Sequence, residues 1–482
     1  MLVMKFGGTS VGSGERILHV ARVILAHLDQ QPVVVTSAMS GVTDALLALA
    51  SAASAGDTAA CEAQLAALVS RHDAAARTID QEADWKDLHQ KLDALHSSVE
   101  AVLAKQDHSS AVCDMIVSWG ERLAVVLVAG ALRSLGQPAL AWDLPVVGTD
   151  GHARPLAETT RQLAGEALSQ AGDALLVAPG FIAQMPDGRI TTLGRGGSDY
   201  SATLLAAALQ AGGCWIYTDV DGVLSADPRI VQEAQILPFV SPQTAGRLSY
   251  SGAKVLHPQS VAPVARLGIP LRVRNTFRPD HPGTLIASLQ GEQRAASRAI
   301  TGRRSLAAIV FTGDGLPEVP HFFGRMCQAM TSVGIEIILS VHPGTGYDPQ
   351  ILVNKVHAPV ALERLSQEFA LERAQGLVSS ISIHDGLALC TLIAEQIDHQ
   401  ALAQVQRTLA AEDLVPLVQT AFPCALSFVL HERELDRAIR SIHREVIEPA
   451  LRQHTRSLAR DPASPSWGDN ETAEQRFAKL CS

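Results

Sequence analysis

Apolar positions along residues 1–286 alternate between short continuous runs and runs with helical spacing. The continuous runs predict buried strands at residues 2–6, 31–36, 175–178 and 215–218. Apolar side chains three or four positions apart predict a helix over residues 17–28 with Ser13 as its N-cap, and they predict largely helical structure over 57–136. This alternation of strands and helices predicts an α/β sandwich.

The pattern changes after a breaker-rich segment at residues 278–284, and we expect the polar stretch that follows, as far as Arg304, to be a linker. Beyond it, a strand-helix-strand-strand-helix order occurs twice, which predicts two consecutive ferredoxin-like units. The predicted elements of the first unit are 306–311, 320–333, 335–341, 350–356 and 359–370. Those of the second are 386–393, 398–411, 413–419, 425–430 and 432–446. We expect the polar tail from about residue 452 to be poorly ordered.

Composition narrows the class of protein. No apolar run reaches the roughly 18 residues that span a bilayer, and the N-terminus lacks the basic region of a secretory signal, so we expect a cytoplasmic protein with no membrane partner. The cysteines are scattered and form no C-x-x-C, which indicates reduced thiols and no zinc site. A net charge of −10 argues against a nucleic-acid partner.

The first chemical motif is Lys5-Phe6-Gly7-Gly8-Thr9-Ser10, at the end of the first predicted strand and just before a helix. Two glycines let the backbone approach phosphate oxygens, while the amides, the helix N-terminus and Lys5 favour negative charge. A lone Gly-Gly is usually only a turn. A lysine, two glycines and two hydroxyls together predict a phosphate site, although the pattern is not that of a P-loop.

The second motif, Gly194-Arg195-Gly196-Gly197-Ser198-Asp199, leads into a predicted helix over residues 200–209. Its backbone again feeds a helix start, and Arg195 can hold a carboxylate through two hydrogen bonds. The alternative interpretation is a turn between a hairpin and a helix, in which Ser198 is merely the N-cap.

Two further motifs supply charged side chains. Acidic residues at the end of a buried strand, Thr218-Asp219-Val220-Asp221-Gly222, suit Mg²⁺ or ribose contacts, and Arg229 suits phosphate. The segment at residues 251–258 brings in Lys254, in a chain where lysine is scarce. Each signal is weak alone, because Asp-Gly is an ordinary turn and a single lysine is usually solvated.

Together these motifs resemble the aspartate kinase branch of the amino acid kinase family. Residues 3–11, Val-Met-Lys-Phe-Gly-Gly-Thr-Ser-Val, match that branch's signature throughout, and motifs at 37–44, 120–123, 193–201, 218–222 and 248–258 occur in the family's order. The resemblance implies a three-layer α/β amino acid kinase sandwich over residues 1–286. More weakly, it implies two ferredoxin-like ACT units at 304–383 and 384–450, followed by the polar tail 451–482.

The resemblance also implies roles for individual residues. Lys5 and Asp199 are implied as the catalytic pair, and no residue is implied as a metal ligand. Residues implied to bind ATP and its phosphates are Gly7, Gly8, Thr9, Ser10, Thr218, Asp219, Arg229 and Lys254. Residues implied to bind aspartate are Thr43, Glu121 (on the α-ammonium), Arg195 (on a carboxylate) and Ser198.

The implied activity is transfer of the γ-phosphoryl group of ATP, with Mg²⁺, to the β-carboxylate of L-aspartate. A carboxylate nucleophile with a pKa of about 3.9 is already ionised at neutral pH, so no general base is needed. The family further implies a homodimer or larger oligomer and an amino-acid effector at the ACT units. Because only a short tail follows the second unit, we expect no fused homoserine dehydrogenase.

The sequence departs from the family pattern at several positions. Leu224 stands where an aromatic residue near the nucleotide is usual, and residues 244–247 lack the usual glutamate. Ile338 stands where lysine-inhibited members commonly carry an aspartate, and residues 418–422 lack a small polar run. Two alternatives therefore stay open: a kinase with another carboxylate or carbamate acceptor, and a nucleotide- or amino-acid-binding regulator without turnover.

Overall fold

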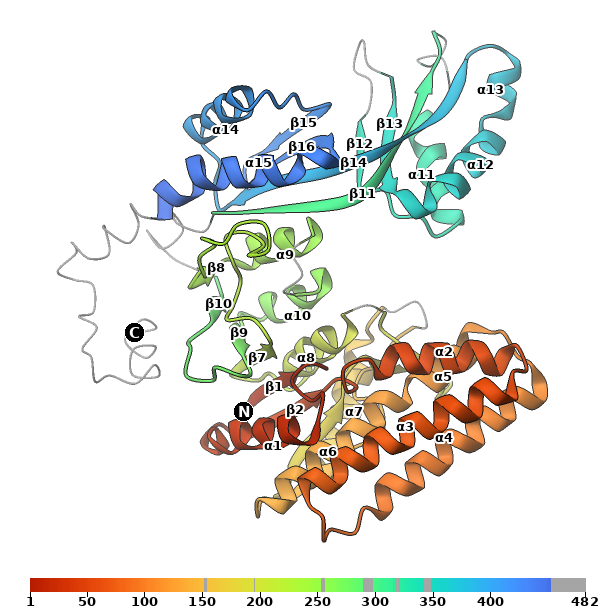
Figure 1. Ribbon diagram of the computed structural model, residues 1–482, viewed down its shortest axis with the longest axis vertical. Helices are drawn as coiled ribbons and strands as arrows, with labels where there is room; N and C mark the ends of the chain where they lie inside the picture. Colours follow the sequence, from red (N-terminus) through yellow and green to blue (C-terminus); the bar gives the residue numbers. More distant parts are fainter. Residues whose placement is uncertain are drawn as a thin grey trace, which may run out of the picture.

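A computed structural model describes residues 1–150, 154–194, 196–252, 256–288, 298–314, 316, 319, 321–341 and 348–451. Two sheets organise this part of the chain (Figure 1). The first has eight strands in the order β3-β4-β2-β1-β7-β9-β10-β8, and the second has six in the order β12-β13-β11-β14-β16-β15. A small hairpin of β5 (Ile182–Gln184) and β6 (Ile190–Thr192) stands apart.

Strands of the first sheet are β1 (Leu2–Phe6), β2 (Pro32–Thr36), β3 (Ala139–Ala141), β4 (Leu175–Pro179), β7 (Gly213–Thr218), β8 (Phe239–Val240), β9 (Leu271–Asn275) and β10 (Thr284–Ile286). Strand β1 lies between β2 and β7, parallel to both, and all of its residues are buried. Burial on both faces explains why the central strands are continuous apolar runs in the sequence. Because the strands are parallel, the carboxyl ends of β1, β2 and β7 meet at one edge.

The helices of this part of the chain are α1 (Gly14–Leu25), α2 (Val42–Ser54), α3 (Thr58–Ile79), α4 (Lys86–Lys105), α5 (Ser110–Val117), α6 (Trp119–Ser134), α7 (Ala157–Ala171), α8 (Gly197–Ala208), α9 (Pro242–Tyr250) and α10 (Ala262–Ala265). Helices α6, α7 and α8 pack against the first sheet, whereas α2 to α5 form a bundle that packs on α1 and α6 (Figure 1). The predicted N-cap of α1 is confirmed, because the Ser13 side chain accepts a hydrogen bond from Arg16 N, but the helix ends at Leu25, before the predicted residue 28. The stretch Ser110–Ser134 is long and apolar enough to cross a membrane, but 83% of its most apolar window is buried, as in a core helix.

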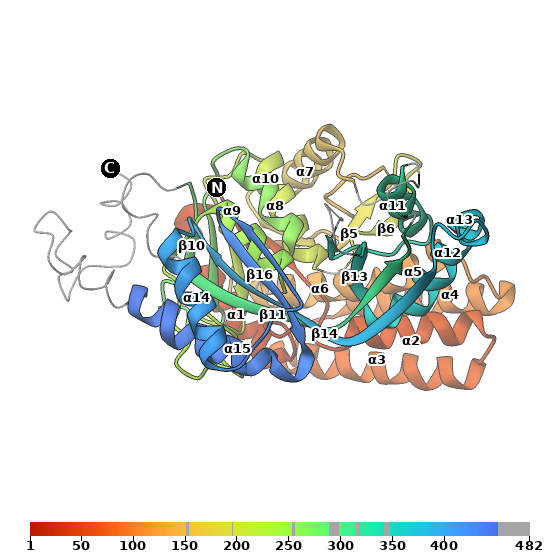
Figure 2. The ribbon, with the colours of Figure 1, turned by 90° about the horizontal axis from the view of Figure 1, so that it is seen from above.

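The second sheet is built from β11 (Arg298–Thr312), β12 (Leu339–Val341), β13 (Gln350–Asn354), β14 (Ser380–Ala394), β15 (Val418–Phe422) and β16 (Ala425–His431). Its helices are α11 (Phe322–Ser332), α12 (Ala358–Glu368), α13 (Ala370–Ala374), α14 (His399–Ala411) and α15 (Leu435–Ile442). Figure 2 shows β11, β14 and β16 running together across the molecule. The mixed α/β architecture and the antiparallel C-terminal sheet agree with the predicted fold class.

The predicted linker is wrong at its C-terminal end. Strand β11 begins at Arg298, not after Arg304, and its first half pairs with the second half of β14, from Arg298↔Ala394 to Arg303↔Leu389. The arginines make this segment polar in the sequence, so it shows no strand pattern, although Ala299 and Ile300 between them are buried. The long β11–β14 pair therefore links both halves of the sheet, and the unit boundaries 304–383 and 384–450 stay predictions.

Three other strands of the second sheet begin at residues other than those predicted. Strand β14 begins at Ser380, not at residue 386. Strand β12 begins at Leu339, not at residue 335, and β15 begins at Val418, not at 413. At the second position Asp413 has a φ of 53° and Leu414 is buried, so this segment turns before it can enter the sheet. The predicted disordered tail lies, after Leu451, outside the described residues.

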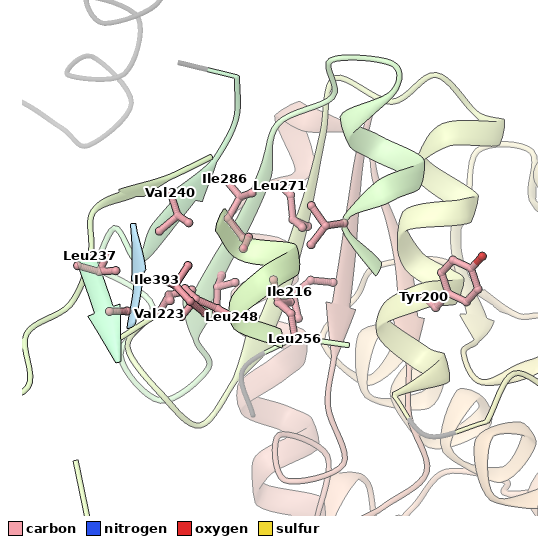
Figure 3. Close-up of a cluster of buried hydrophobic side chains, with 14 of the residues drawn as sticks. Tyr200, Ile216, Val223, Leu237, Val240, Leu248, Leu256, Leu271, Ile286 and Ile393 are labelled. Atoms are coloured by element: carbon pink, nitrogen blue, oxygen red, sulfur yellow. The ribbon is translucent and has the colours of Figure 1, made fainter. Parts of the chain in front are cut away.

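The two sheets are joined by one continuous hydrophobic cluster. Figure 3 shows Ile393, from the end of β14, beside Val223, Leu237 and Val240 of the N-terminal part of the chain. A buried polar contact adds to it, because Ser225 Oγ lies 2.9 Å from His443 Nε2, and Ile300 N donates to Ser225 O at 2.8 Å. The second sheet is thus packed against the first part of the chain.

Candidate active site

The glycine motif forms a tight turn at the end of β1. Gly7 N donates to Tyr217 O at 3.2 Å, and Ser10 N donates to Gly7 O at 2.9 Å. A Cβ at Gly8 would lie only 2.8 Å from the backbone oxygen of Ala38, so a larger residue would displace the turn. Among the described residues, the amides of Gly8 and Thr9 have no backbone partner. Free amides at the edge of a sheet can bind phosphate oxygens.

Lys5 and Asp199, the predicted catalytic pair, meet beside this turn. Lys5 Nζ lies 2.5 Å from Asp199 Oδ1, and their side chains are only 10% and 14% exposed. Lys5 comes from the end of β1, and Asp199 from the first turn of α8, after Gly196 with a φ of 73°. The carboxylate fixes the ammonium at the carboxyl edge of the sheet, next to a helix N-terminus that favours anions.

Glu121 provides a second charged group in this region, from the first turn of α6. It is 3% exposed, and its Oε1 accepts a hydrogen bond from Ala38 N at 3.1 Å. Its Oε2 has no hydrogen-bond partner in the described part of the chain. Burial raises the pKa of Glu121 to about 8, and this rise is opposed by the Ala38 amide and the positive charge of Lys5. A buried carboxyl with an unused oxygen suits a ligand ammonium.

Ser198 and Thr43 occupy helix starts. Ser198 is 9% exposed in the first turn of α8, beside Asp199, and a Cβ at Gly180 would lie 2.7 Å from its Cβ. This close packing fixes the start of α8 against the end of β4. Thr43 is half-buried in the first turn of α2. Contact of either side chain with aspartate stays a prediction.

The strand next to β1 brings the acidic motif to the same edge. Phe6 pairs with Tyr217, so Thr218 lies one position beyond, next to Gly7. Thr218 Oγ1 donates to Asp219 Oδ1 at 3.2 Å, and Asp219 is exposed. Its neighbour Asp221 is held by Asn275 Nδ2 at 2.8 Å and by Arg278, so Asp219 is the more open carboxylate.

Two predicted phosphate ligands are engaged by their own neighbours. Arg229 makes a two-point ion pair with Asp227, with Nε–Oδ1 and NH2–Oδ2 distances of 3.0 and 2.6 Å. Ser10 is fully buried, and its Oγ lies 2.6 Å from Thr276 Oγ1. A phosphate must compete with these contacts, so both roles stay predictions. Arg195 and Lys254 lie outside the described residues.

Thr276 is a positioning residue that the motifs did not reveal. Besides its contact with Ser10, its amide donates to Thr218 O at 2.8 Å, and its carbonyl oxygen lies 2.7 Å from His19 Nε2. It therefore joins the glycine turn, the acidic loop and α1. The sequence signal was a pair of polar residues, Asn275-Thr276, at the end of a buried strand.

Comparison with known proteins fits this geometry. The model of the amino acid kinase family matches residues 1–275, and the chain belongs to that family. Bifunctional aspartokinase/homoserine dehydrogenase 1, chloroplastic, of Zea mays is 30% identical over 460 residues, which are 92% of this chain and 50% of the maize protein. Aspartokinase 1, chloroplastic, of Arabidopsis thaliana is 28% identical, over 92% of this chain and 80% of its own length.

A solved structure gives a likeness along most of the chain. E. coli aspartokinase III in complex with aspartate and ADP superimposes with a TM-score of 0.79 at 26% identity, covering 93% of this chain and 100% of that one. The chain spans about half the length of the bifunctional relatives that it matches. The likeness therefore includes both the first sheet and the C-terminal antiparallel sheet.

Proposed function

We propose that this protein is an aspartate kinase, which converts L-aspartate and ATP to 4-phospho-L-aspartate and ADP. The proposal rests on one observation above all: Lys5, held by Asp199, stands at a glycine turn with unused amides, and a buried carboxyl, Glu121, lies close by. Likeness to a structure that holds aspartate and ADP supports this choice of ligands. The reaction would open lysine, threonine and methionine biosynthesis in the cytoplasm.

Catalysis by these residues consists of alignment and neutralisation of charge. The attacking group is the β-carboxylate of the substrate, already ionised, so the chain does not need to remove a proton. Lys5 Nζ and the free amides of Gly8 and Thr9 stabilise the charge on the transferring phosphoryl group. Asp199 keeps the Lys5 ammonium in place, which preserves the alignment of donor and acceptor.

Substrate orientation falls to Glu121. Its unused Oε2 would accept a hydrogen bond from the α-ammonium of aspartate, and that cation would stabilise the ionised carboxylate against the cost of burial. We propose that Ser198 and Thr43, at the starts of α8 and α2, hold the rest of the substrate, together with Arg195.

Magnesium fits this site as an ion carried by ATP. The described residues contain no group of three or more His, Cys, Asp or Glu side chains arranged to hold a metal ion. Mg²⁺ commonly keeps several waters and binds through phosphates and one or two carboxylates, which Asp199 and the exposed Asp219 would supply here. When bound, it neutralises phosphate charge.

Regulation and assembly belong to the same proposal. Ile338 is 8% exposed and packs in a small apolar cluster with Leu306 and Leu352, so its side chain cannot pair an effector ammonium. We propose that the C-terminal sheet senses an amino acid other than lysine, and that the protein is a homodimer or larger. A monomer by light scattering would contradict the second statement.

Trapping the acyl phosphate as a hydroxamate tests the activity. The protein is incubated with ATP, Mg²⁺ and hydroxylamine, with L-aspartate or L-glutamate, each with and without lysine or threonine. We expect hydroxamate from aspartate alone, with no effect of lysine. Product from glutamate instead would indicate another acceptor, and no product from either acid would favour the binding regulator.

A further inference from the structure

A cavity of about 820 Å³ lies beside α1 and extends to the amino ends of the central strands of the first sheet. Its lining includes Met1, Gly213 and Pro270, at the amino ends of β1, β7 and β9, whereas Lys5 and Thr218 stand at the carboxyl ends. Strands of this length separate the two edges by roughly 15 Å. Helix α1, close to the chain's N-terminus in Figure 1, forms one wall of the cavity.

Among the charged side chains that line this cavity, cations outnumber acidic groups. Arg22, Arg272 and Arg274 all line it, with His19 also present, and Asp280 is the acidic residue among them. This excess of positive charge occurs in a protein whose net charge is −10. A local reversal of charge inside a cavity concentrates anions there.

Arg274 gives the strongest indication of an anion site, because it is buried without a carboxylate partner in the described part of the chain. It is 8% exposed, and no carboxylate within the described ranges forms an ion pair with it. Its NH2 donates to Pro279 O at 2.5 Å, and its guanidinium lies over Trp215 at 4.6 Å, but its Nε has no hydrogen-bond partner. A buried guanidinium without a carboxylate is costly, and one carbonyl and the rings of Trp215 and Tyr217 offset only part of that cost.

Arg22 supports the same interpretation from another element. It stands in the last turn of α1, and in the described part of the chain its side chain forms neither an ion pair nor a hydrogen bond. Arg272 NH1 donates to Pro282 O at 2.8 Å, on the far side of the cavity. Guanidinium groups bind phosphate and carboxylate oxygens through paired hydrogen bonds, so three of them around one cavity suit a multivalent anion.

We propose that this cavity is a second ligand site, which binds a small multivalent oxyanion carrying phosphate or carboxylate groups. The ligand would complete the hydrogen bonding of Arg274 and pair with Arg22. None of the residues proposed above to bind ATP or aspartate lines the cavity, so the proposal does not depend on the proposed function.

Trp215, in the cavity wall, offers a local probe of binding. The five tryptophans are labelled as 5-fluorotryptophan, and the Trp215 resonance is assigned with Trp215→Phe. Pyrophosphate and citrate are then titrated separately at constant ionic strength, with ¹⁹F NMR detection. We expect a saturable shift of the Trp215 signal with at least one probe, and the more effective probe identifies phosphate or carboxylate chemistry. No shift of this signal with either anion would overturn the proposal.

Variants distinguish binding from a structural role of the arginines. Arg22→Gln should weaken the effective probe about tenfold, because it removes one charge-assisted contact. Arg77→Gln is the matched control, because Arg77 is an exposed arginine in the last turn of α3 and does not line the cavity. The affinity of this variant for the same probe should stay within about twofold of wild type. Arg274→Lys, checked for folding by circular dichroism, keeps the charge but loses the fork and should also weaken binding. Unchanged affinity in Arg22→Gln and Arg274→Lys would contradict the assignment.

Discussion

At the scale of single residues, the proposed catalysis depends on the Lys5–Asp199 ion pair beside the glycine turn. The ammonium is nearly buried and is held at 2.5 Å by one carboxylate, so little freedom remains in its position. A preorganised charge of this kind stabilises a transition state without having to reorganise during the reaction.

Lys5→Ala should therefore lower kcat by about 100-fold or more, with a smaller effect on the KM for ATP. Steady-state kinetics with aspartate and ATP measure both constants. Lys105→Ala, which removes an exposed lysine from the end of α4, is the control and should leave both unchanged. A Lys5→Ala enzyme with near wild-type turnover would show that the site is placed wrongly.

We expect a substitution of Glu121 to weaken the binding of aspartate more than it slows turnover. Glu121→Gln keeps the hydrogen bond from Ala38 N but removes the charge that would face the substrate ammonium. We expect the KM for aspartate to rise about tenfold while kcat changes less. A lower kcat at unchanged KM would place Glu121 in the chemical step instead.

The raised pKa of Glu121 also makes the free energy of unfolding depend on pH. Burial raises the pKa of Glu121 in the folded protein to about 8, above its ordinary value of 4.5, so the folded state holds a proton that the unfolded state has lost between these values. Its contribution to stability is therefore lost as pH rises toward 8. Urea unfolding should show Glu121→Gln gaining about 2 kcal/mol relative to wild type between pH 6 and pH 8. A constant difference would contradict the assigned pKa.

At the scale of elements, the glycine turn tolerates no side chain at Gly8, unlike the position of Gly165 in a helix. An added Cβ at Gly8 meets Ala38 O at 2.8 Å, and the Ala38 amide also holds Glu121, so Gly8→Ala disturbs two parts of the site. We expect kcat/KM to fall by up to about 100-fold. Gly165→Ala in α7 meets nothing within 4 Å, and it should keep full activity and gain about 0.5–1 kcal/mol of stability. Equal kinetics for the two variants would refute this reading of the turn.

Elements with strong local signals were predictable from the sequence. Strand β1 is a continuous apolar run that ends in glycines, and α1 has both helical spacing and a serine cap, so local chemistry determines them. The start of β11 was not predictable, because arginines flank its buried Ala299 and Ile300 and only pairing with β14 makes a strand of it.

In the candidate site too, local features were predictable and contacts between distant segments were not. Parallel strands bring Lys5 and Thr218 to one edge of the sheet, and α8 places Asp199 beside Lys5. Motifs alone could not predict the contacts between segments that are distant in the sequence. The Thr276–Ser10 hydrogen bond joins residues 266 positions apart, and the pairing of Arg229 with Asp227 depends on how their turn folds.

At the scale of the whole molecule, the two sheets share a hydrophobic cluster and the buried Ser225–His443 contact at 2.9 Å. His443→Ala would leave the Ser225 hydroxyl without this partner, so we expect the free energy of unfolding to fall by about 1–3 kcal/mol. His399→Ala, at the exposed start of α14, should change stability by less than about 0.5 kcal/mol. Urea denaturation measures both, and equal effects would argue that the contact does not join the two parts.

The most direct test of the central claim is identification of the reaction product by NMR. The protein is incubated with Mg-ATP and L-aspartate labelled with ¹³C at the β-carboxyl, and ¹³C and ³¹P spectra are recorded, with Lys5→Ala in parallel. We expect a new acyl phosphate signal coupled to the labelled carbon, formed by the wild type and not by the variant. Release of inorganic phosphate without that signal, or an acyl phosphate formed equally by both proteins, would contradict it.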